Sequence, residues 1–175
     1  MGEVLTLEAA REWRSRQAAA GRAVVLTNGH FDLLHVGHLR YLKSARQLGD
    51  ALVVGLNSDA STRSRKPGRP LVPQEERAEL LAALACVDVV VIFDDLTANA
   101  LVRDLRPEIY VKGGDWGQPG GPQPPEGEVV ASYGGRVVYL SYVPNHSTSS
   151  LIERIRALPS TPGTPGRTGT PGRIP

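Results

Sequence analysis

Apolar residues along this chain form two kinds of pattern. Short continuous runs cover residues 23–26, 51–56, 87–93, 108–111 and 136–140, and they are rich in Val, Ile and Leu. Such runs are typical of strands buried on both faces of a parallel sheet. Between them, apolar residues recur every three or four positions in residues 39–48, 73–84, 97–105 and 126–133. That spacing predicts helices.

Two further helices are predicted at the ends of this series. One runs from Thr6, a residue type favoured as an N-cap, to Gly21, which ends it. The other begins at residues 147–150 and carries an apolar set up to Leu158. Thr97 is expected to cap the helix that follows the third strand. The alternation of strands and helices predicts an α/β protein, a Rossmann-like three-layer α/β/α sandwich with a five-stranded parallel sheet.

Composition divides the chain into one domain and a tail. The 175 residues are 41% hydrophobic and 22% charged, which fits one soluble globular domain, and we assign residues 1–158 to it. Residues 159–175 repeat Thr-Pro-Gly three times, and their only large apolar residue is Ile174. Such a segment cannot bury enough surface to offset the entropy of ordering it, so a disordered tail is expected.

Charge and cysteine content exclude several classes of protein. The chain has 20 Lys and Arg against 18 Asp and Glu, and the tail arginines, Arg167 and Arg173, account for the excess. A neutral body argues against nucleic-acid binding, which needs a basic face. No apolar stretch reaches membrane length and no signal-peptide pattern is seen, so a cytoplasmic protein without a membrane partner is expected. The single cysteine, Cys86, excludes an internal disulfide.

Candidate chemistry gathers in residues 27–38, between the first predicted strand and the helix after it. His35 and His38 are three residues apart and therefore share one face of a helix. Gly37 between them would let an anion approach the backbone. Two imidazoles at a helix N-terminus favour phosphate binding, and they can stabilise charge in phosphoryl chemistry. A zinc site is less favoured, because no third ligand stands at a suitable spacing.

These residues resemble a known family. The segment His35-Val36-Gly37-His38 matches the HxGH motif of the nucleotidyltransferase superfamily, which includes the cytidylyltransferases. Three further segments, Thr-Asn-Gly-x-Phe-Asp at 27–32, Asn-Ser-Asp at 57–59 and Lys-Gly-Gly-Asp at 112–115, resemble one branch. That branch is the D-glycero-β-D-manno-heptose 1-phosphate adenylyltransferases of ADP-heptose biosynthesis, often fused to a kinase. The similarity covers residues 5–158, and His30 stands where the branch commonly has cysteine.

The resemblance implies transfer of AMP from ATP to a sugar 1-phosphate, with Mg²⁺ accompanying the ATP. Lys66, in the basic loop 63–70, would join the two histidines as a catalytic residue, with Arg63 and Arg65 as helpers. The Ser-Thr-Ser run at 147–149 would bind phosphates at a second helix N-terminus, and 112–115 would hold the nucleoside. The expected nucleotide-binding residues are Thr27, Asn28, Gly29, Phe31, Gly37, Lys112, Gly113, Asp115, Ser147, Thr148 and Ser149.

Four polar residues are assigned to the acceptor substrate with less support from the pattern. They are Asp32, Asn57, Asp59 and Arg77, and Arg77 could equally be a solvated surface side chain. No metal-ligating residues are assigned. A homodimer is left open as the oligomeric state.

Two other functions stay open at this point. The first is a cytidylyltransferase acting on glycerol 3-phosphate or a similar small phosphate. The second is a nucleotide-binding regulator without catalysis, against which the intact histidine pair argues. Class I aminoacyl-tRNA synthetases use a related histidine motif, but this chain is too short and too neutral for tRNA.

Overall fold

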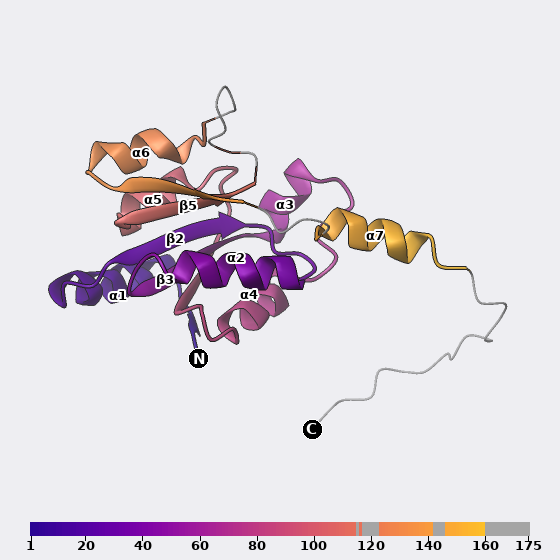
Figure 1. Ribbon diagram of the computed structural model, residues 1–175, viewed down its shortest axis with the longest axis horizontal. Coiled ribbons are helices and arrows are strands. Elements are labelled where there is room, and N and C mark those ends of the chain that lie inside the picture. Colours follow the sequence, from indigo (N-terminus) through magenta and orange to yellow (C-terminus); the bar gives the residue numbers. More distant parts are fainter. Residues whose placement is uncertain (115, 117–122, 142–145, 160–175) are drawn as a thin grey trace.

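The protein is an α/β sandwich built on a six-stranded parallel sheet with the strand order β1-β4-β3-β2-β5-β6 (Figure 1). The computed structural model describes residues 1–114, 116, 123–141 and 146–159. All neighbouring strands pair in parallel. The strands are β1 (Glu3–Val4), β2 (Val24–Gly29), β3 (Ala51–Asn57), β4 (Val89–Phe93), β5 (Ile109–Gly113) and β6 (Arg136–Leu140).

Five of these strands confirm the runs predicted from the sequence, and the sixth corrects the predicted number. β1 pairs Glu3 with Val89 and Val4 with Val90 at the edge of the sheet. Both of its residues are exposed. A two-residue strand is too short to show any hydrophobic period. β1 is therefore recognised only by its pairing with β4.

Helices cover both faces of the sheet. On one face, α2 (Val36–Arg46) and α4 (Gln74–Ala82) pack against side chains such as Leu52 and Val54. On the other, α1 (Leu7–Ala19), α5 (Asn99–Leu105) and α6 (Glu126–Ser132) pack against Val24 and Val53. Successive residues of β3 therefore serve opposite cores, as strand alternation requires. The three-layer fold predicted from the sequence is confirmed.

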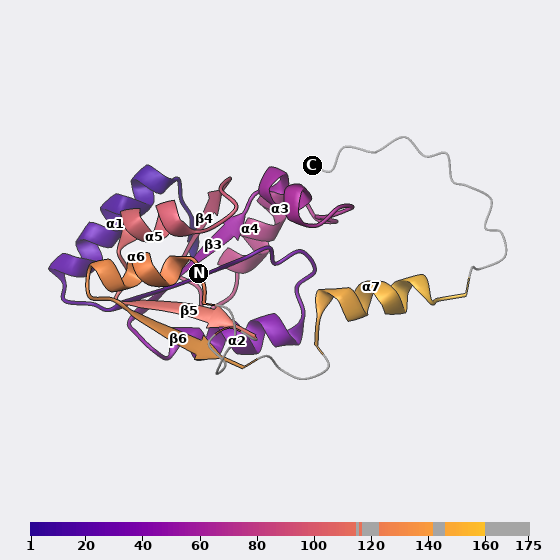
Figure 2. The same cartoon turned by 90° about the horizontal axis from the view of Figure 1, so that it is seen from above.

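The last helix stands apart from these layers. α7 (Thr148–Arg156) has no buried residue and extends away from the sandwich in both views (Figures 1 and 2). Its first residues lie near the end of β2, because the Thr148 hydroxyl reaches the Leu33 carbonyl at 3.5 Å. Only the start of α7 is therefore positioned by the body of the protein.

Two local predictions are wrong. Part of the expected basic loop is helical, because α3 (Asp59–Arg65) begins after β3 with Ser58 as its N-cap. The Ser58 hydroxyl accepts the Ser61 N–H, which starts the helix without an apolar period. The N-cap of α5 is Ala98, without a side-chain bond, so Thr97 does not cap it. No helix within the described ranges is long and apolar enough to cross a bilayer.

The order of the strands creates a crevice. From β2 the chain moves outward through β3 and β4, and then returns to place β5 on the other side of β2. Helices that leave β2 and β5 therefore diverge, and α/β proteins bind ligands at the carboxyl ends of strands at such a switch point.

Candidate functional site

A cavity of about 680 Å³ opens at the carboxyl ends of β2 and β5. Its walls come from the turn after β2, the start of α2, the end of α3, the end of β5, the start of α6 and the start of α7. The segments lie far apart in the sequence, and the sheet order brings them together. Predicted site residues that line the cavity are Asn28, Gly29, Phe31, Asp32, His35, Gly37, His38, Asn57, Lys66, Lys112, Gly113, Ser147, Thr148 and Ser149.

The two histidines form a stacked pair at the N-terminus of α2. His35 is the N-cap residue and His38 lies in the first turn, with ring centroids 3.9 Å apart and an interplanar angle of 21°. The Phe31 ring contacts His38 edge-on, with centroids 5.2 Å apart. Phe31 has φ of +42°, a backbone conformation that is uncommon for residues other than glycine. Residues in such conformations are often found at functional sites.

Gly37 is needed for this stack. A Cβ at position 37 would lie 2.9 Å from the His35 ring and 2.9 Å from the His146 Cβ. Any side chain would therefore push the His35 ring out of place. The sequence predicted close approach of an anion at Gly37, and the structure adds a steric reason for the glycine.

Both imidazoles are neutral at pH 7. Burial, and then repulsion by Lys66 and by His35 whenever that ring is protonated, lower the pKa of His38 to about 4. Burial, and then His146, lower the pKa of His35. The Nδ1 atoms of both rings are buried and have no hydrogen-bond partner among the described residues. A buried bare nitrogen costs less than a buried unpaired N–H, which favours the tautomer that carries hydrogen on Nε2 and offers a donor to the cavity.

Basic residues from α3 and the loop after it line another part of the cavity. Lys66 is the C-cap residue of α3, and burial followed by the charge of Arg69 lowers its pKa, while Asp32 opposes them. Arg65 and Arg69 also line the cavity. Arg63 does not, because its guanidinium is mostly exposed and pairs with Asp59 at 3.5 Å. Of the two predicted helpers, Arg65 is thus the one placed at the site.

Asp32 joins this basic loop to the histidine turn. Its Oδ1 accepts the backbone N–H groups of Leu71 and Val72 at 2.7 and 3.1 Å, and its Oδ2 lies 3.6 Å from Arg69. The carboxylate is 4% exposed. Asp32 therefore fixes the loop that carries Lys66, in addition to lining the cavity.

Arg77 is completely buried. It donates hydrogen bonds to the backbone carbonyls of His30, Asn57 and Val72 and pairs with Asp59 at 2.7 Å. Neither Arg77 nor Asp59 lines the cavity. This placement does not support the predicted contact of Arg77 and Asp59 with the substrate. The alternative prediction, that Arg77 is a solvated surface side chain, is wrong because Arg77 is buried. Arg77 stabilises the ends of β2 and β3 through its hydrogen bonds to the His30 and Asn57 carbonyls.

Polar residues at the switch point form a network between β2 and β5. Asn28 Oδ1 accepts from the Tyr110 hydroxyl at 2.6 Å and from the Lys112 ammonium at 2.8 Å. Thr27 is buried, with its hydroxyl 2.6 Å from the Tyr41 hydroxyl, and does not line the cavity. Gly114 has φ of +91°, which glycine adopts without strain. The prediction for Asp115 lies outside the described residues.

The hydroxyls at the start of α7 divide their roles. Ser147 caps the helix, since its Oγ accepts the Ser150 N–H at 3.0 Å. Thr148 and Ser149 line the cavity in the first turn, where backbone N–H groups lack intrahelical partners. This arrangement places a second helix N-terminus beside the stacked histidines.

Sequence reasoning missed several residues that line the cavity. Arg69 could have been chosen from the basic loop, and Trp116 directly follows the Lys-Gly-Gly-Asp segment. Glu126 and Pro125, at the start of α6, carried no signal, because nothing local marks that helix as facing β5. The cavity residues not assigned from the sequence are His30, Tyr41, Arg69, Leu96, Thr97, Trp116, Pro125, Glu126 and His146.

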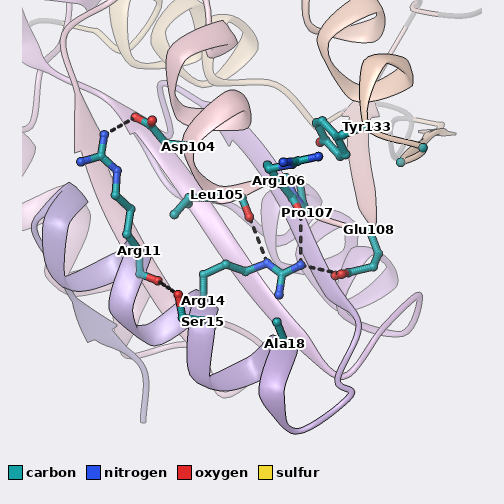
Figure 3. A pocket seen from close by; sticks show the side chains of 12 residues that line it. Arg11, Arg14, Ser15, Ala18, Asp104, Leu105, Arg106, Pro107, Glu108 and Tyr133 are labelled. Carbon is teal, nitrogen blue, oxygen red and sulfur yellow. Dashed lines mark hydrogen bonds and ion pairs between the residues drawn. The ribbon is translucent and has the colours of Figure 1, made fainter.

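A second cavity of about 510 Å³ lies between α1, the α5–β5 turn and the end of α6 (Figure 3). Arg14 crosses it and donates to the carbonyls of Leu105 and Arg106 and to the Glu108 carboxylate. Arg11 pairs with Asp104 at 2.9 Å. These contacts fasten α1 to α5 and to the segment before β5.

Comparisons with known proteins identify a matching family and similar proteins. Residues 26–154 match the model of the cytidylyltransferase-like family. The chain is 52% identical over 150 residues to the bifunctional protein HldE of Syntrophotalea carbinolica, covering 85% of this chain and 30% of that protein. It is 54% identical over 140 residues to the bifunctional protein HldE of Geobacter sulfurreducens, covering 79% of this chain and 28% of the relative. The chain thus spans less than a third of these relatives.

A solved structure is similar as well. It is the lipopolysaccharide core biosynthesis protein from Thermoplasma volcanium, with a TM-score of 0.57 and 28% sequence identity. The match covers 70% of this chain and 98% of that one.

Proposed function

Because this chain belongs to the cytidylyltransferase-like family, we propose that it transfers AMP from ATP to a sugar 1-phosphate and releases pyrophosphate. We infer that the acceptor is D-glycero-β-D-manno-heptose 1-phosphate, from the motif resemblance and the similarity to the HldE proteins. The observation that carries the proposal is the stacked pair of neutral histidines at a helix N-terminus, which lines the cavity at the switch point.

The reaction needs no side-chain nucleophile. A phosphate oxygen of the sugar forms a bond to the α-phosphorus of ATP, while the bond from that phosphorus to the bridging oxygen of pyrophosphate breaks. Such transfer depends on positioning and on stabilising charge. The Nε2–H groups of His35 and His38 would donate to oxygens that gain charge, and the N-terminus of α2 adds its dipole.

Cations at the edge of the cavity would receive the leaving group. Lys66, Arg65 and Arg69 supply positive charge, and the start of α7 supplies backbone N–H groups near Ser149. The nucleoside would lie against Lys112, Gly113 and Trp116, which line the cavity wall.

Mg²⁺ would arrive with the triphosphate. The described residues contain no group of three or more His, Cys, Asp or Glu suited to hold a metal ion. This fits an ion that keeps several waters and is bound mainly by substrate phosphates. When bound, Mg²⁺ would offset the negative charge of the phosphates. Asp32, an acidic residue of the cavity wall, already accepts two backbone N–H groups.

Cellular location and assembly are part of the proposal. ATP and sugar phosphates are cytoplasmic metabolites, so we place the protein in the cytoplasm. A homodimer remains a prediction, which light scattering of the purified chain would test.

The decisive experiment is pyrophosphate release measured over a grid of nucleotides and acceptors. The nucleotides are ATP and CTP, and the acceptors are the heptose 1-phosphate, other sugar 1-phosphates and glycerol 3-phosphate. Of all the pairs, ATP with the heptose 1-phosphate should give the highest kcat/KM. A preference for CTP and glycerol 3-phosphate would replace this function with the cytidylyltransferase alternative. ATP binding in calorimetry without turnover of any acceptor would favour a regulator.

A further inference from the structure

A buried carboxylate stands in the wall of the cavity without a place in the proposed chemistry. Glu126 is the first residue of α6 and is 1% exposed. Burying a carboxylate is costly unless other groups compensate its charge. The groups around Glu126 therefore indicate what this charge does.

One oxygen of Glu126 fastens a neighbouring helix. Its Oε1 accepts the backbone N–H of Ala98 at 2.8 Å, and Ala98 is the N-cap residue of α5. No side chain of α5 itself caps that end. Glu126 thereby connects the segment of Thr97, which lines the cavity, to the start of α6.

The other oxygen faces the Lys112 ammonium. Lys112 Nζ lies 3.4 Å from Glu126 Oε2 and 2.8 Å from Asn28 Oδ1. It also lies 5.4 Å from the centroid of the Tyr110 ring and 5.6 Å from that of Trp116. The side chains of Lys112 and Glu126 are 13% and 2% exposed, so water screens their attraction little.

The Glu126 carboxylate favours the charged form of Lys112. Burial is the largest influence on its pKa and lowers it, Glu126 raises it, and Arg65 on α3 lowers it further. Tyr110, on the same strand, stays neutral, because burial and the charge of Glu126 raise its pKa far above the ordinary value. Asn28 on β2 carries no charge. Glu126 is therefore the one acid that compensates the Lys112 ammonium among the described groups packed around it.

We propose that Glu126 is a positioning residue that holds Lys112 as a charged ammonium in the cavity wall, where it binds the nucleotide. The same carboxylate joins three segments that line the cavity, through Thr97, Lys112 and Pro125. The nucleotide as ligand rests on the proposed function, whereas the coupling of Glu126 to Lys112 rests on the distances above.

Binding of ATP without an acceptor tests this coupling separately from turnover. Calorimetry would give the Kd for Mg-ATP between pH 7.5 and 10 in the wild type and in Glu126→Gln, Lys112→Met and the double variant. Glutamine keeps an acceptor for the Ala98 N–H and removes only the charge. Glu128→Gln, an exposed change on the same helix, is the matched control and should behave like the wild type.

Loss of the counter-charge should move the alkaline weakening of ATP binding in Glu126→Gln to lower pH, by about one unit. At the alkaline end of this range the variant should bind ATP more weakly than the wild type, by at most about tenfold. Lys112→Met should bind weakly and without that pH dependence, and adding Glu126→Gln to it should change Kd little. The pKa of Lys66 is lowered as well, so Lys66 can also weaken ATP binding at alkaline pH. The Lys112→Met variant shows which part of the pH dependence comes from Lys112.

Superimposable profiles for Glu126→Gln and the wild type, or a full additional loss in the double variant, would overturn the proposal. If Glu126→Gln fails to fold, the double variant should recover the fold, since it removes the unpaired buried ammonium. No recovery would also overturn it. If binding follows the expected pattern while no acceptor is converted, this inference stands and the proposed function fails.

Discussion

The stacked histidines show how single residues can set the electrostatics of a phosphate site. An imidazolium pair would repel itself, and burial removes that problem by keeping both rings neutral. Each ring can then donate one hydrogen bond without bringing a net charge. The positive charge at the cavity comes instead from Lys66, Arg65 and Arg69.

Replacing either His35 or His38 with alanine should lower kcat about a hundredfold or more, the cost of losing one donor to the charged transition state. Folding should be retained, because the His35 side chain makes no capping bond. Steady-state rates and thermal melts of each variant test this, with Arg40→Ala on the exposed face of α2 as control. Unchanged rates would remove the pair from the mechanism.

The histidines should also make the protein sensitive to acid. Burial, and then nearby positive charges, lower the pKa of His30 and of His38 from 6.5 to about 4. The unfolded chain therefore binds more protons between these values, and stability falls as the pH drops from 6.5 towards 4. After allowance for partial exposure, each histidine should cost on the order of 1–2 kcal/mol at pH 5.

Thermal melts at pH 7 and pH 5 would measure this loss. The melting temperature should fall by on the order of 5–10 °C, and the drop should be smaller in His30→Asn and in His38→Asn. An equal drop in wild type and variants would show that other groups cause the acid sensitivity.

Single residues were predictable where a motif surrounds them. His35, His38 and Lys66 lie at the cavity as the sequence indicated. Arg77 could not be placed, because its partners are carbonyls and a carboxylate 5 to 47 residues away. Glu126 could not be placed either, since no local pattern shows that it meets Lys112 across the cavity wall.

At the scale of elements, the sandwich depends on polar clamps between segments as well as on its two apolar cores. Arg77 on α4 holds the ends of β2 and β3, and Asp32 holds the loop after α3. Arg14 on α1 and Glu108 before β5 form a similar clamp at the opposite end (Figure 3). Glu108 also accepts the Val24 N–H at 2.7 Å.

Arg77→Met should destabilise the protein by about 3–5 kcal/mol, because Asp59 and three carbonyls lose their donor. Arg103→Met, on an exposed position of α5, should cost less than about 0.5 kcal/mol. Urea unfolding followed by circular dichroism gives both values. Equal stability of the two variants would show that Arg77 is dispensable as a brace.

Elements were predictable to the extent that they carry a period. The five longer strands and the helices around them follow from apolar spacing. β1 and α3 were missed for opposite reasons: β1 is too short to carry a period, and α3 is polar and is started by the Ser58 cap. The N-cap of α5 was misplaced because Glu126, from another helix, binds the Ala98 N–H.

For the whole molecule, the reversal of strand order at β2 determines where chemistry can occur. It places Asn28 and Lys112, 84 residues apart in sequence, within 2.8 Å. The other segments that line the cavity also follow the carboxyl ends of strands. The proposed chemistry is therefore assigned to the cavity at this switch point.

Removing residues 159–175 should leave activity and stability unchanged, because the composition of that segment offers almost no apolar surface to bury. The truncated and full-length chains should agree within about twofold in kcat/KM and within about 1 kcal/mol in stability, the ordinary scale of a surface change. A larger loss of activity would assign the tail a role at the site.

The sequence alone determined the alternation of strands and helices, the class of the fold and the place of the histidine turn between a strand and a helix. These depend on local periodicity and on short motifs, which a chain carries whatever its partners. Tertiary structure alone decided which strands are neighbours, that Arg77 turns inward and that Glu126 meets Lys112. A hydrophobic period shows which side of an element is buried, whereas the partner of a polar side chain depends on long-range packing.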